Sequence, residues 1–219
     1  MIQLPQIVYL QTITACNGHC QYCPFDDVYG DKEPESMSQD VFCAVIGWLQ
    51  DQRYKERLGF LLHYEPTMDT DLNWRLEYAR EALPGVGMEV ATNGIIDNPV
   101  LQLFDRVDCV PAGSLDNATS RAGNCRATPE TIHGKRLVES PCALPIHTMC
   151  IAANGNVLLC CQDWRHEAVV GTYKDLTAAR ENQLRYAKKA WNQELEICQD
   201  CTTGKTAEEV GERLGKRSL

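Results

Sequence analysis

The sequence predicts an α/β fold, with a parallel sheet in residues 1–140 and a small β-hairpin followed by a helix in residues 141–219. Three observations favour this fold. Apolar strand patterns alternate with amphipathic helix patterns up to about residue 110, an order typical of a parallel sheet with right-handed crossovers. Polar or cysteine-bearing loops follow four of these strands. After Cys142 the pattern changes to a hairpin, marked by Asn154–Gly155, and one long helix.

The first expected strand is Ile7–Thr14, a run of β-branched and aromatic residues that suits a buried strand. A turn-rich loop follows, and Ser38 then has the character of a helix N-cap. The helix after it places Val41, Val45, Trp48 and Leu49 on one face. The other elements expected in this half are a strand at Leu58–His63, a helix at Asp71–Leu83, a strand at Met88–Thr92, a short helix at Pro99–Phe104 and a strand at Val107–Val110.

The second half begins with a segment that predicts no regular element, residues 117–140, where Ala, Gly, Asn, Thr and Pro dominate. Ile146–Ala152 and Asn156–Cys160 are then expected to pair as a hairpin, because Asn-Gly between two apolar runs is a strong turn signal. Asp175–Trp191 shows helical periodicity. Residues 141–219 are therefore expected to hold one hairpin and one helix.

The composition excludes several classes of protein. The chain has 219 residues and a formal net charge of −9. An acidic surface has no general attraction for nucleic-acid backbones or anionic membranes. No stretch approaches the roughly 18 unbroken apolar residues that a membrane span needs, and Met1–Pro5 shows no secretory signal. The sequence therefore predicts a cytoplasmic protein with no membrane partner and no general binding of nucleic acids.

Twelve cysteines are many for a cytoplasmic protein. Cys16, Cys20 and Cys23 crowd one loop, and Cys198 and Cys201 form a C-x2-C pair. Disulfide scaffolds with such counts are short exported chains, and this chain is neither short nor marked for export. Clustered thiols in this setting favour metal sites, and disulfide bonds are the alternative.

The first cysteine cluster has the spacing C-x3-C-x2-C. Three thiolates from one short loop can hold three irons of a 4Fe–4S cluster, which leaves the fourth iron open to a substrate. A loop that follows a buried strand also gives the cluster a rigid support. The alternative is a zinc site of three cysteines completed by His19 or another ligand.

The run Cys16-Asn-Gly-His-Cys20-Gln-Tyr-Cys23 resembles, without gaps, the signature of the radical S-adenosylmethionine (SAM) superfamily. The resemblance implies a partial (β/α) barrel in residues 1–140 whose 4Fe–4S cluster binds SAM at its open iron. An external reductant such as flavodoxin or ferredoxin would supply the electron that cleaves SAM to methionine and a 5′-deoxyadenosyl radical, which abstracts a substrate hydrogen. The resemblance also implies that Tyr22 packs near the adenine.

Three further segments resemble the family. His63-Tyr64-Glu65-Pro66 stands where many members have Gly-Gly-Glu-Pro, which implies that Glu65 holds the SAM amino group although both glycines are replaced. Thr92-Asn93-Gly94 and Ser114-Leu115-Asp116 resemble segments after the third and fourth strands. Ligands of such sheets bind beyond the carboxyl ends of the strands. An ordinary turn is the alternative for each segment. The cofactor-binding candidates are Tyr22, Glu65, Asn93, Ser114 and Asp116.

The second set of cysteines, Cys142-x12-Gly155-x4-Cys160 followed by Cys198-x2-Cys201, resembles the auxiliary-cluster region called SPASM, or its shortened form, twitch. A hairpin and a returning helix would bring four thiolates to one end of residues 141–219, enough to saturate a second 4Fe–4S cluster. Cys150 or Cys161 could replace Cys142 or Cys160 as a ligand. A structural zinc ion is the alternative, because four thiolates suit zinc equally well.

Other cysteines have different expected roles. Cys125, Cys150 and Cys161 are candidate hydrogen-atom donors to a substrate radical, and a buried thiol without a function is the alternative for each. Cys43 and Cys109 are expected in the core. Asp163 and Trp164, just beyond the second cluster site, could face the active site.

The resulting hypothesis is a radical SAM oxidoreductase in which the auxiliary cluster accepts an electron. Dehydrogenation of an aminocyclitol by short twitch enzymes is the nearest functional analogy, and related enzymes modify peptides. About 15 residues precede Cys16, which favours a small molecule or a peptide delivered by a partner. About 28 residues separate Ser114 from Cys142, so the barrel is expected to be truncated to about four strands, with an open side that admits bulky substrates.

Two other classes compete with this hypothesis. One is a non-catalytic iron–sulfur protein that transfers electrons, and the other is a zinc-binding protein. Neither class requires a SAM site, so neither gives a role to Glu65 and Asn93 at the expected rim.

Overall fold

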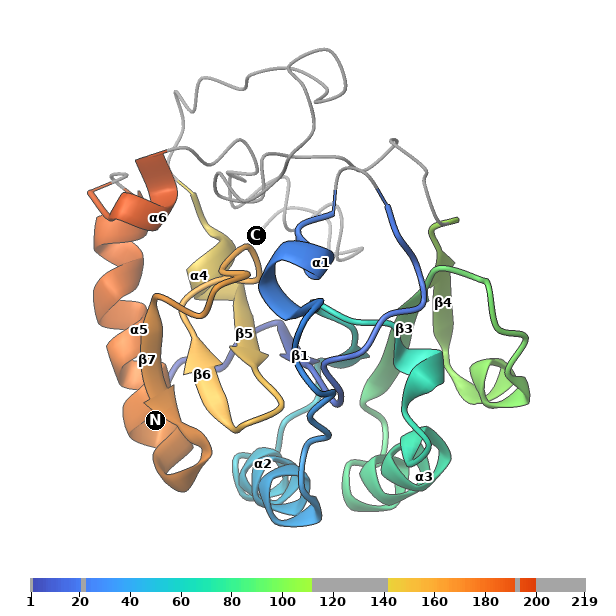
Figure 1. Cartoon of the computed structure of the whole chain (residues 1–219). Helices are drawn as coiled ribbons and strands as arrows, with labels where there is room; N and C mark the ends of the chain where they lie inside the picture. The colour runs from blue at the N-terminus through green and yellow to red at the C-terminus, as the bar shows by residue number, and fades with distance from the viewer. Residues whose placement is uncertain (1, 21–22, 112–141, 192–193, 200–219) are drawn as a thin grey trace.

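The computed structural model describes residues 2–20, 23–111, 142–191 and 194–199. In these residues seven strands form a single sheet with the order β4-β3-β2-β1-β5-β6-β7 (Figure 1). The strands are β1 (Ile7–Leu10), β2 (Arg57–Phe60), β3 (Gly87–Thr92), β4 (Arg106–Cys109), β5 (Thr148–Ile151), β6 (Asn156–Leu158) and β7 (Val169–Thr172). The helices are α1 (Phe25–Tyr29), α2 (Gln39–Asp51), α3 (Leu72–Ala82), α4 (Leu144–His147), α5 (Leu176–Trp191) and α6 (Glu196–Gln199). Three short 3₁₀ helices are η1 (Pro66–Met68), η2 (Pro99–Leu103) and η3 (Tyr173–Asp175).

The sheet combines a parallel and an antiparallel part. Strands β1 to β4 pair in parallel, and β5 joins the other side of β1, also in parallel. Strands β6 and β7 then continue the sheet in antiparallel order. The two predicted segments, 1–140 and 141–219, thus contribute strands to one sheet. The predicted boundary between them lies outside the described residues.

The predicted elements of the first half occur close to their expected positions, but the first two strands end earlier than expected, at Leu10 and Phe60. The first strand ends at Leu10, because the chain then leaves β2 to pair with a returning segment. Thr12 accepts a hydrogen bond from the Met37 amide at 2.8 Å, and Ile13 forms an antiparallel bridge with Ser36. This local pairing closes the loop that carries the N-terminal cysteines.

Helices α2, α3 and α5 cover one face of the sheet and bury the main core (Figure 1). Helix α2 begins at the predicted cap, where the Ser38 hydroxyl accepts a hydrogen bond from the Val41 amide at 3.3 Å. Of its predicted apolar face, Val41, Val45 and Leu49 are buried, and Trp48 is half-buried. A second, smaller apolar cluster is formed by side chains of β1, β5 and β6 and of the residue just after β5. Its members are Ile7, Tyr9, Cys150, Ala152 and Leu158.

Helix α5 is fixed to the sheet by two buried polar side chains. The Arg180 guanidinium is fully buried and donates to the carbonyls of Gln3 and Pro145, each at 3.0 Å. The Gln183 amide donates to the carbonyls of Thr148 on β5 and Leu159 just after β6, also at 3.0 Å. These bonds satisfy backbone groups where the parallel and antiparallel parts of the sheet meet.

The antiparallel pair β5/β6 lies where the sequence predicts a hairpin. Cys150 pairs with Leu158, and the turn between the strands holds Gly155 at φ 81. A side chain at this position would meet the Tyr173 ring, since an added Cβ would lie 2.4 Å from Tyr173 Cδ1. Glycine is therefore required here by both backbone conformation and space.

The unpredicted elements in the described residues include α1, α4, α6, β7 and η1. Each has only three to five residues, too few for periodicity to stand out. The expectation for Cys109 was wrong, because its side chain is exposed. In the described sheet β4 is an edge strand, with a neighbouring strand on one side only. Cys43 on α2 is half-buried.

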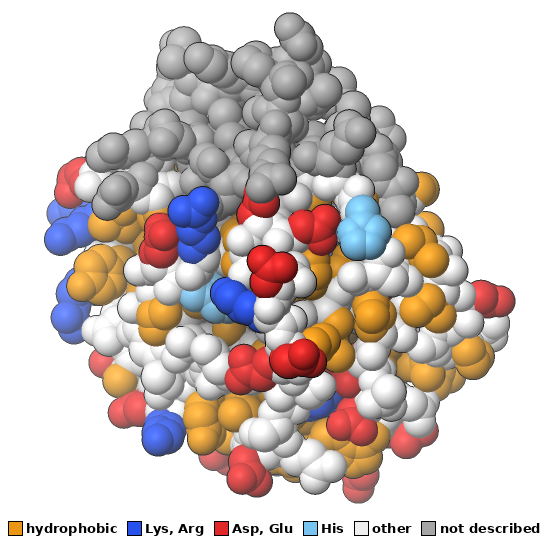
Figure 2. Space-filling view, viewed as in Figure 1, with side chains coloured by type: hydrophobic (Ala, Val, Ile, Leu, Met, Phe, Trp, Pro, Cys, Tyr) orange, Lys and Arg blue, Asp and Glu red, His pale blue; other side chains and the backbone are white. Residues whose placement is uncertain are grey.

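The surface agrees with the acidic composition. Figure 2 shows acidic side chains across the face that carries α1, with Lys and Arg side chains scattered among them. Among the described helices, none combines the length and apolar character that crossing a membrane would require.

Candidate functional site

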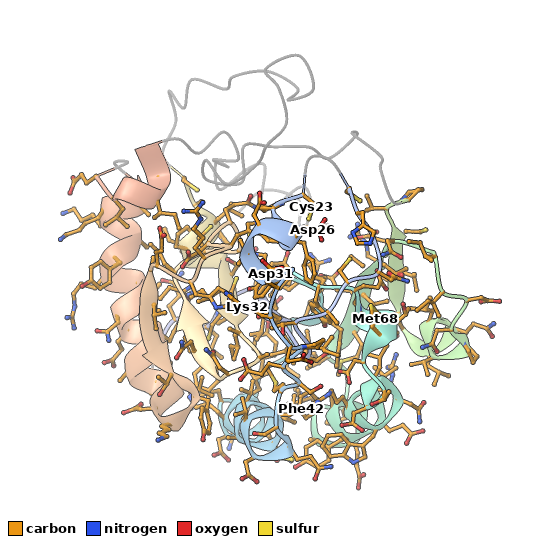
Figure 3. All side chains as sticks on the ribbon, in the orientation of Figure 1. Cys23, Asp26, Asp31, Lys32, Phe42 and Met68 are labelled. Atoms are coloured by element: carbon orange, nitrogen blue, oxygen red, sulfur yellow. The ribbon has the colours of Figure 1, made fainter. Side chains whose placement is uncertain are left out.

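Three loops that follow parallel strands meet at one end of the sheet. Cys16 lies beyond β1, Glu65 beyond β2 and Asn93 beyond β3. The Glu65 amide donates to the carbonyl of Ala15 at 2.9 Å, which ties the second loop to the start of the cysteine loop. Cys23 lies just before α1, above Phe42 of α2 in the view of Figure 3. The carboxyl edge of the parallel strands is therefore the candidate site.

Glu65 is the centre of this arrangement. Its side chain is 2% exposed, and Oε1 accepts hydrogen bonds from the Thr67 amide at 3.1 Å and from the hydroxyls of Thr67 and Thr92 at 2.7 Å. Oε2 accepts a hydrogen bond from the Asn93 amide at 2.7 Å. Each carboxylate oxygen can accept at least two hydrogen bonds. Oε2 thus retains capacity for a further donor.

Asn93 joins the carboxylate to the cysteine loop. Its amide nitrogen Nδ2 donates to Asn17 Oδ1 at 2.7 Å and lies 3.9 Å from the Cys16 sulfur. Its Oδ1 accepts a hydrogen bond from the Ile95 amide at 3.0 Å, a local turn that fixes the side chain. The structure therefore brings together three residues that the sequence places in separate motifs: Cys16, Glu65 and Asn93.

The cysteine loop is partly ordered by its own backbone. The Gly18 amide donates to the Cys16 sulfur at 3.4 Å, and the Cys23 amide donates to the Cys20 carbonyl at 2.9 Å. All three thiols are half-buried. Burial raises the pKa of the Cys16 thiol, and the charges of Glu65 and Cys20 add to that effect. A metal that binds here therefore has to displace the Cys16 proton.

His19, the expected fourth ligand of a zinc site, lies beside an acidic side chain. Its Nδ1 is 3.3 Å from Asp26 Oδ2, and both side chains are largely exposed. In the part of the chain that the structure describes, no group of three or more His, Cys, Asp or Glu side chains is arranged to hold a metal ion. The donor chemistry of the loop, with three thiols and few competing oxygens, fits an iron–sulfur cluster.

The C-terminal cysteines divide between two sides of the sheet. Cys160 and Cys198 pack against the main core beside α5, whereas Cys161 packs on the smaller cluster that contains Cys150. Both residues follow the end of β6, and their thiols still lie close enough to share a hydrogen bond. Cys142 is half-buried and close enough to raise the pKa of Cys160 electrostatically.

The thiols around Cys161 influence one another. Hydrogen bonding with Cys161, followed by burial, raises the pKa of the Cys160 thiol well above its usual value. Burial first, and then Cys161, raises the pKa of Cys150 in the same direction. Without a metal, these groups are therefore protonated thiols at neutral pH.

Several predicted site residues lie outside the described residues. These residues are Tyr22, Ser114, Asp116, Cys125 and Cys201, and their predicted roles stay predictions.

A polar and aromatic group near the cysteines was largely missed by sequence reasoning. Trp164 stacks on His63, with ring centroids 4.2 Å apart. Tyr29 accepts a hydrogen bond from the Gln11 amide at 3.3 Å, and its hydroxyl lies 3.1 Å from His166 Nε2. Two features of the sequence pointed to this group. His63 stands where the resembled family often has glycine, and Trp164 comes soon after Cys160 and Cys161.

His166 has two unusual features. It adopts φ 58, in the left-handed region that non-glycine residues seldom occupy. Burial lowers the pKa of its imidazole, an effect that Asp163 opposes and Lys32 reinforces. The ring is therefore neutral at pH 7 and can accept a hydrogen bond from the Tyr29 hydroxyl.

Comparisons with known proteins define the fold. No protein-family model matches the chain, and no curated protein sequence matches it. The fold is similar to the crystal structure of BtrN in complex with AdoMet and 2-DOIA, with a TM-score of 0.76 and 17% sequence identity over 95% of this chain and 98% of that chain. It is also similar to selenomethionine BtrN in an open conformation, with a TM-score of 0.72 and 16% identity over 95% of both chains.

Proposed function

We propose that this protein is a radical SAM enzyme that oxidises its substrate by removing a hydrogen atom from carbon. The observation that carries the proposal is the meeting of the Cys16 loop, Glu65 and Asn93 at one edge of a parallel sheet. An electron-transfer or zinc protein has no use for a buried carboxylate with remaining acceptor capacity beside its thiols.

Cys16, Cys20 and Cys23 would hold the N-terminal 4Fe–4S cluster. When bound, the cluster supplies the electron that cleaves SAM to methionine and a 5′-deoxyadenosyl radical. Glu65 would accept a hydrogen bond from the SAM amino group at Oε2, while its bonds to Thr92 and Asn93 fix the carboxylate. Burial of Glu65 strengthens this contact, because few waters compete for the carboxylate.

The likeness to BtrN supports SAM as the cosubstrate, since one of the matched crystal structures contains AdoMet. The presence of 2-DOIA in the same complex supports a small polar molecule as the substrate. A peptide delivered by a partner is the second class of substrate. The parallel strands β1 to β4 would form a truncated (β/α) barrel over residues 1–140.

The C-terminal region would hold a second 4Fe–4S cluster of the twitch type in residues 141–219. Its ligands would be Cys142, Cys160, Cys198 and Cys201, and its role would be to accept an electron from the substrate radical. Cys142 is close enough to Cys160 to raise the pKa of its thiol electrostatically, which supports a site that contains both residues. A flavodoxin or ferredoxin in the cytoplasm would reduce the N-terminal cluster.

The test is reductive SAM cleavage by protein reconstituted anaerobically with iron and sulfide. We expect brown protein with about eight irons per chain and formation of 5′-deoxyadenosine after reduction. Replacement of Cys16, Cys20 and Cys23 by alanine should remove about four irons and abolish the product. Colourless protein that holds only zinc would contradict the proposal, as would an alanine variant that cleaves SAM as the parent does.

A further inference from the structure

A direct contact between the two cysteine regions runs through His63. His63 follows β2 and comes two residues before Glu65, in the loop that reaches the N-terminal cysteines. Its Nε2 lies 2.8 Å from the carbonyl oxygen of Cys161. A carbonyl can only accept, so Nε2 carries the hydrogen and donates this bond. The loop after β2 is thus joined to the C-terminal cysteine pair.

The imidazole also continues into an aromatic cluster. His63 stacks on Trp164 at an interplanar angle of 26°, and Trp164 is 3% exposed. Trp164 packs with Phe25 and Tyr29, and the half-buried Cys16 and Cys23 side chains pack against this group. A continuous set of contacts therefore leads from the N-terminal cysteines through Trp164 and His63 to Cys161.

The position of His63 is itself fixed. Its side chain is 1% exposed, and its carbonyl accepts a long hydrogen bond of 3.5 Å from the Gln11 amide. Gln11 is fully buried, and its own Oε1 accepts a hydrogen bond from the Ala153 amide at 3.4 Å. A buried ring held at its backbone, its face and its Nε2 atom has little freedom to shift.

We propose that His63 is a positioning residue that fixes the Cys160–Cys161 pair against the N-terminal cysteine loop and so sets the separation of the two cofactor sites. The inference rests on the proposed function, because it takes both cysteine regions as cluster sites. It also accounts for an imidazole at a position where the resembled family often has glycine. A glycine there has no side chain with which to reach Cys161.

Two amide variants separate the hydrogen bond from general packing. In His63→Gln the side-chain nitrogen can occupy the place of Nε2 and donate to Cys161. In His63→Asn the nitrogen corresponds to Nδ1 and falls short of Cys161. Both variants place a neutral amide in the same buried site, so their folding costs are similar. Arg165→Gln, an exposed position in the loop after Cys161, is the control.

The first measurement is hydrogen exchange of the metal-free protein. In the parent, Asp163 accepts the amides of Glu167 and Ala168 at 2.9 and 2.8 Å, which orders the loop after the cysteines. In His63→Asn we expect the amides of residues 160–168 to exchange on the order of tenfold faster. His63→Gln and Arg165→Gln should exchange as the parent does.

The second measurement is the magnetic coupling between the two reduced clusters in reconstituted protein, which reports their separation. His63→Asn should broaden or shift this coupling while retaining the iron of the N-terminal site. His63→Gln should restore the parental signal, a rescue that a purely space-filling role does not require. If His63→Asn fails to fold, Trp164→Leu is the substitute. It removes the stack on His63 and should also broaden or shift the coupling.

Equal exchange and equal coupling in His63→Asn and His63→Gln overturn the inference, and so does a parent protein that holds only about four irons. Neither result decides whether the N-terminal site cleaves SAM. Failure of SAM cleavage in the parent overturns the proposed function instead, and the two failures are therefore distinguishable.

Discussion

The N-terminal and C-terminal cysteine regions are stabilised in opposite ways. The first is organised around a buried anion, Glu65, whose hydrogen bonds come from residues that face the site. The second is stabilised by a buried cation, Arg180 on α5. Its guanidinium donates to the backbone carbonyls of Gln3, Pro145 and Thr148. The carboxylate can contact an incoming ligand, whereas the guanidinium is committed to the scaffold. The buried charge therefore serves ligand binding in the N-terminal region and fold stability in the C-terminal region.

Arg180→Met tests whether the buried guanidinium stabilises the fold. The side chain is fully buried, and its loss leaves several carbonyls without donors. We expect the free energy of unfolding to fall by about 3–5 kcal/mol, as when one partner of a buried charged group is removed. Chemical denaturation measures the change. Arg185→Met, at an exposed position of the same helix, should change stability by less than about 0.5 kcal/mol. A small loss at Arg180 would show that the guanidinium is dispensable.

Glu65→Gln tests the other side of the comparison. The new amide nitrogen cannot accept the Asn93 or Thr92 hydrogen bonds, so a buried donor loses its partner. We expect a stability loss of about 1–3 kcal/mol. Formation of 5′-deoxyadenosine should fall by roughly tenfold or more at limiting SAM, which corresponds to about 1.4 kcal/mol.

The control is Glu77→Gln on α3, an exposed glutamate that accepts one hydrogen bond from Asn73 at 3.0 Å. It should leave both stability and product formation within error of the parent. Unchanged SAM cleavage in a folded Glu65→Gln protein would refute the assigned role.

Gly155→Ala probes the hairpin that carries the C-terminal region. The left-handed backbone and the close Tyr173 ring both oppose a side chain, so we expect a stability loss of about 1–3 kcal/mol. Gly47→Ala in α2 is the matched control, because an added Cβ there meets no atom within 4 Å. It should stabilise the protein by about 0.5–1 kcal/mol. Thermal unfolding of both variants distinguishes them, and equal changes would disprove the argument.

The smallest expected effect is the pH dependence that His166 contributes. The folded pKa lies below the ordinary value, so the unfolded chain binds more protons as the pH falls through about 6.5. The contribution to stability is therefore present above that pH and lost below it. His166→Asn tolerates the left-handed backbone and removes the titration. Unfolding at pH 7.5 and 5.5 should show a shallower pH dependence in the variant, and an unchanged dependence would rule out His166 as a source.

The two regions also differ in how far they could be predicted. The C-x3-C-x2-C spacing lies within eight residues, so the sequence alone places its three thiols in one loop. Glu65 and Asn93 could be assigned to the same rim, because the ends of parallel strands converge. The C-terminal set is distributed over about 60 residues, and its geometry depends on how α5 packs. The exposure of Cys109 was missed because a strand pattern does not reveal which strand lies at the edge.

By itself, the sequence determined the order of the longer strands and helices, the Ser38 cap, the Asn154–Gly155 turn and the first cysteine loop, because each depends on neighbours in the chain. Only the tertiary structure decided that Glu65 is bound by Thr92 and Asn93, that Arg180 lies under the sheet, and that His63 reaches Cys161. These contacts join residues far apart in the chain. No local pattern can encode them, since they exist only once the sheet has brought its loops together.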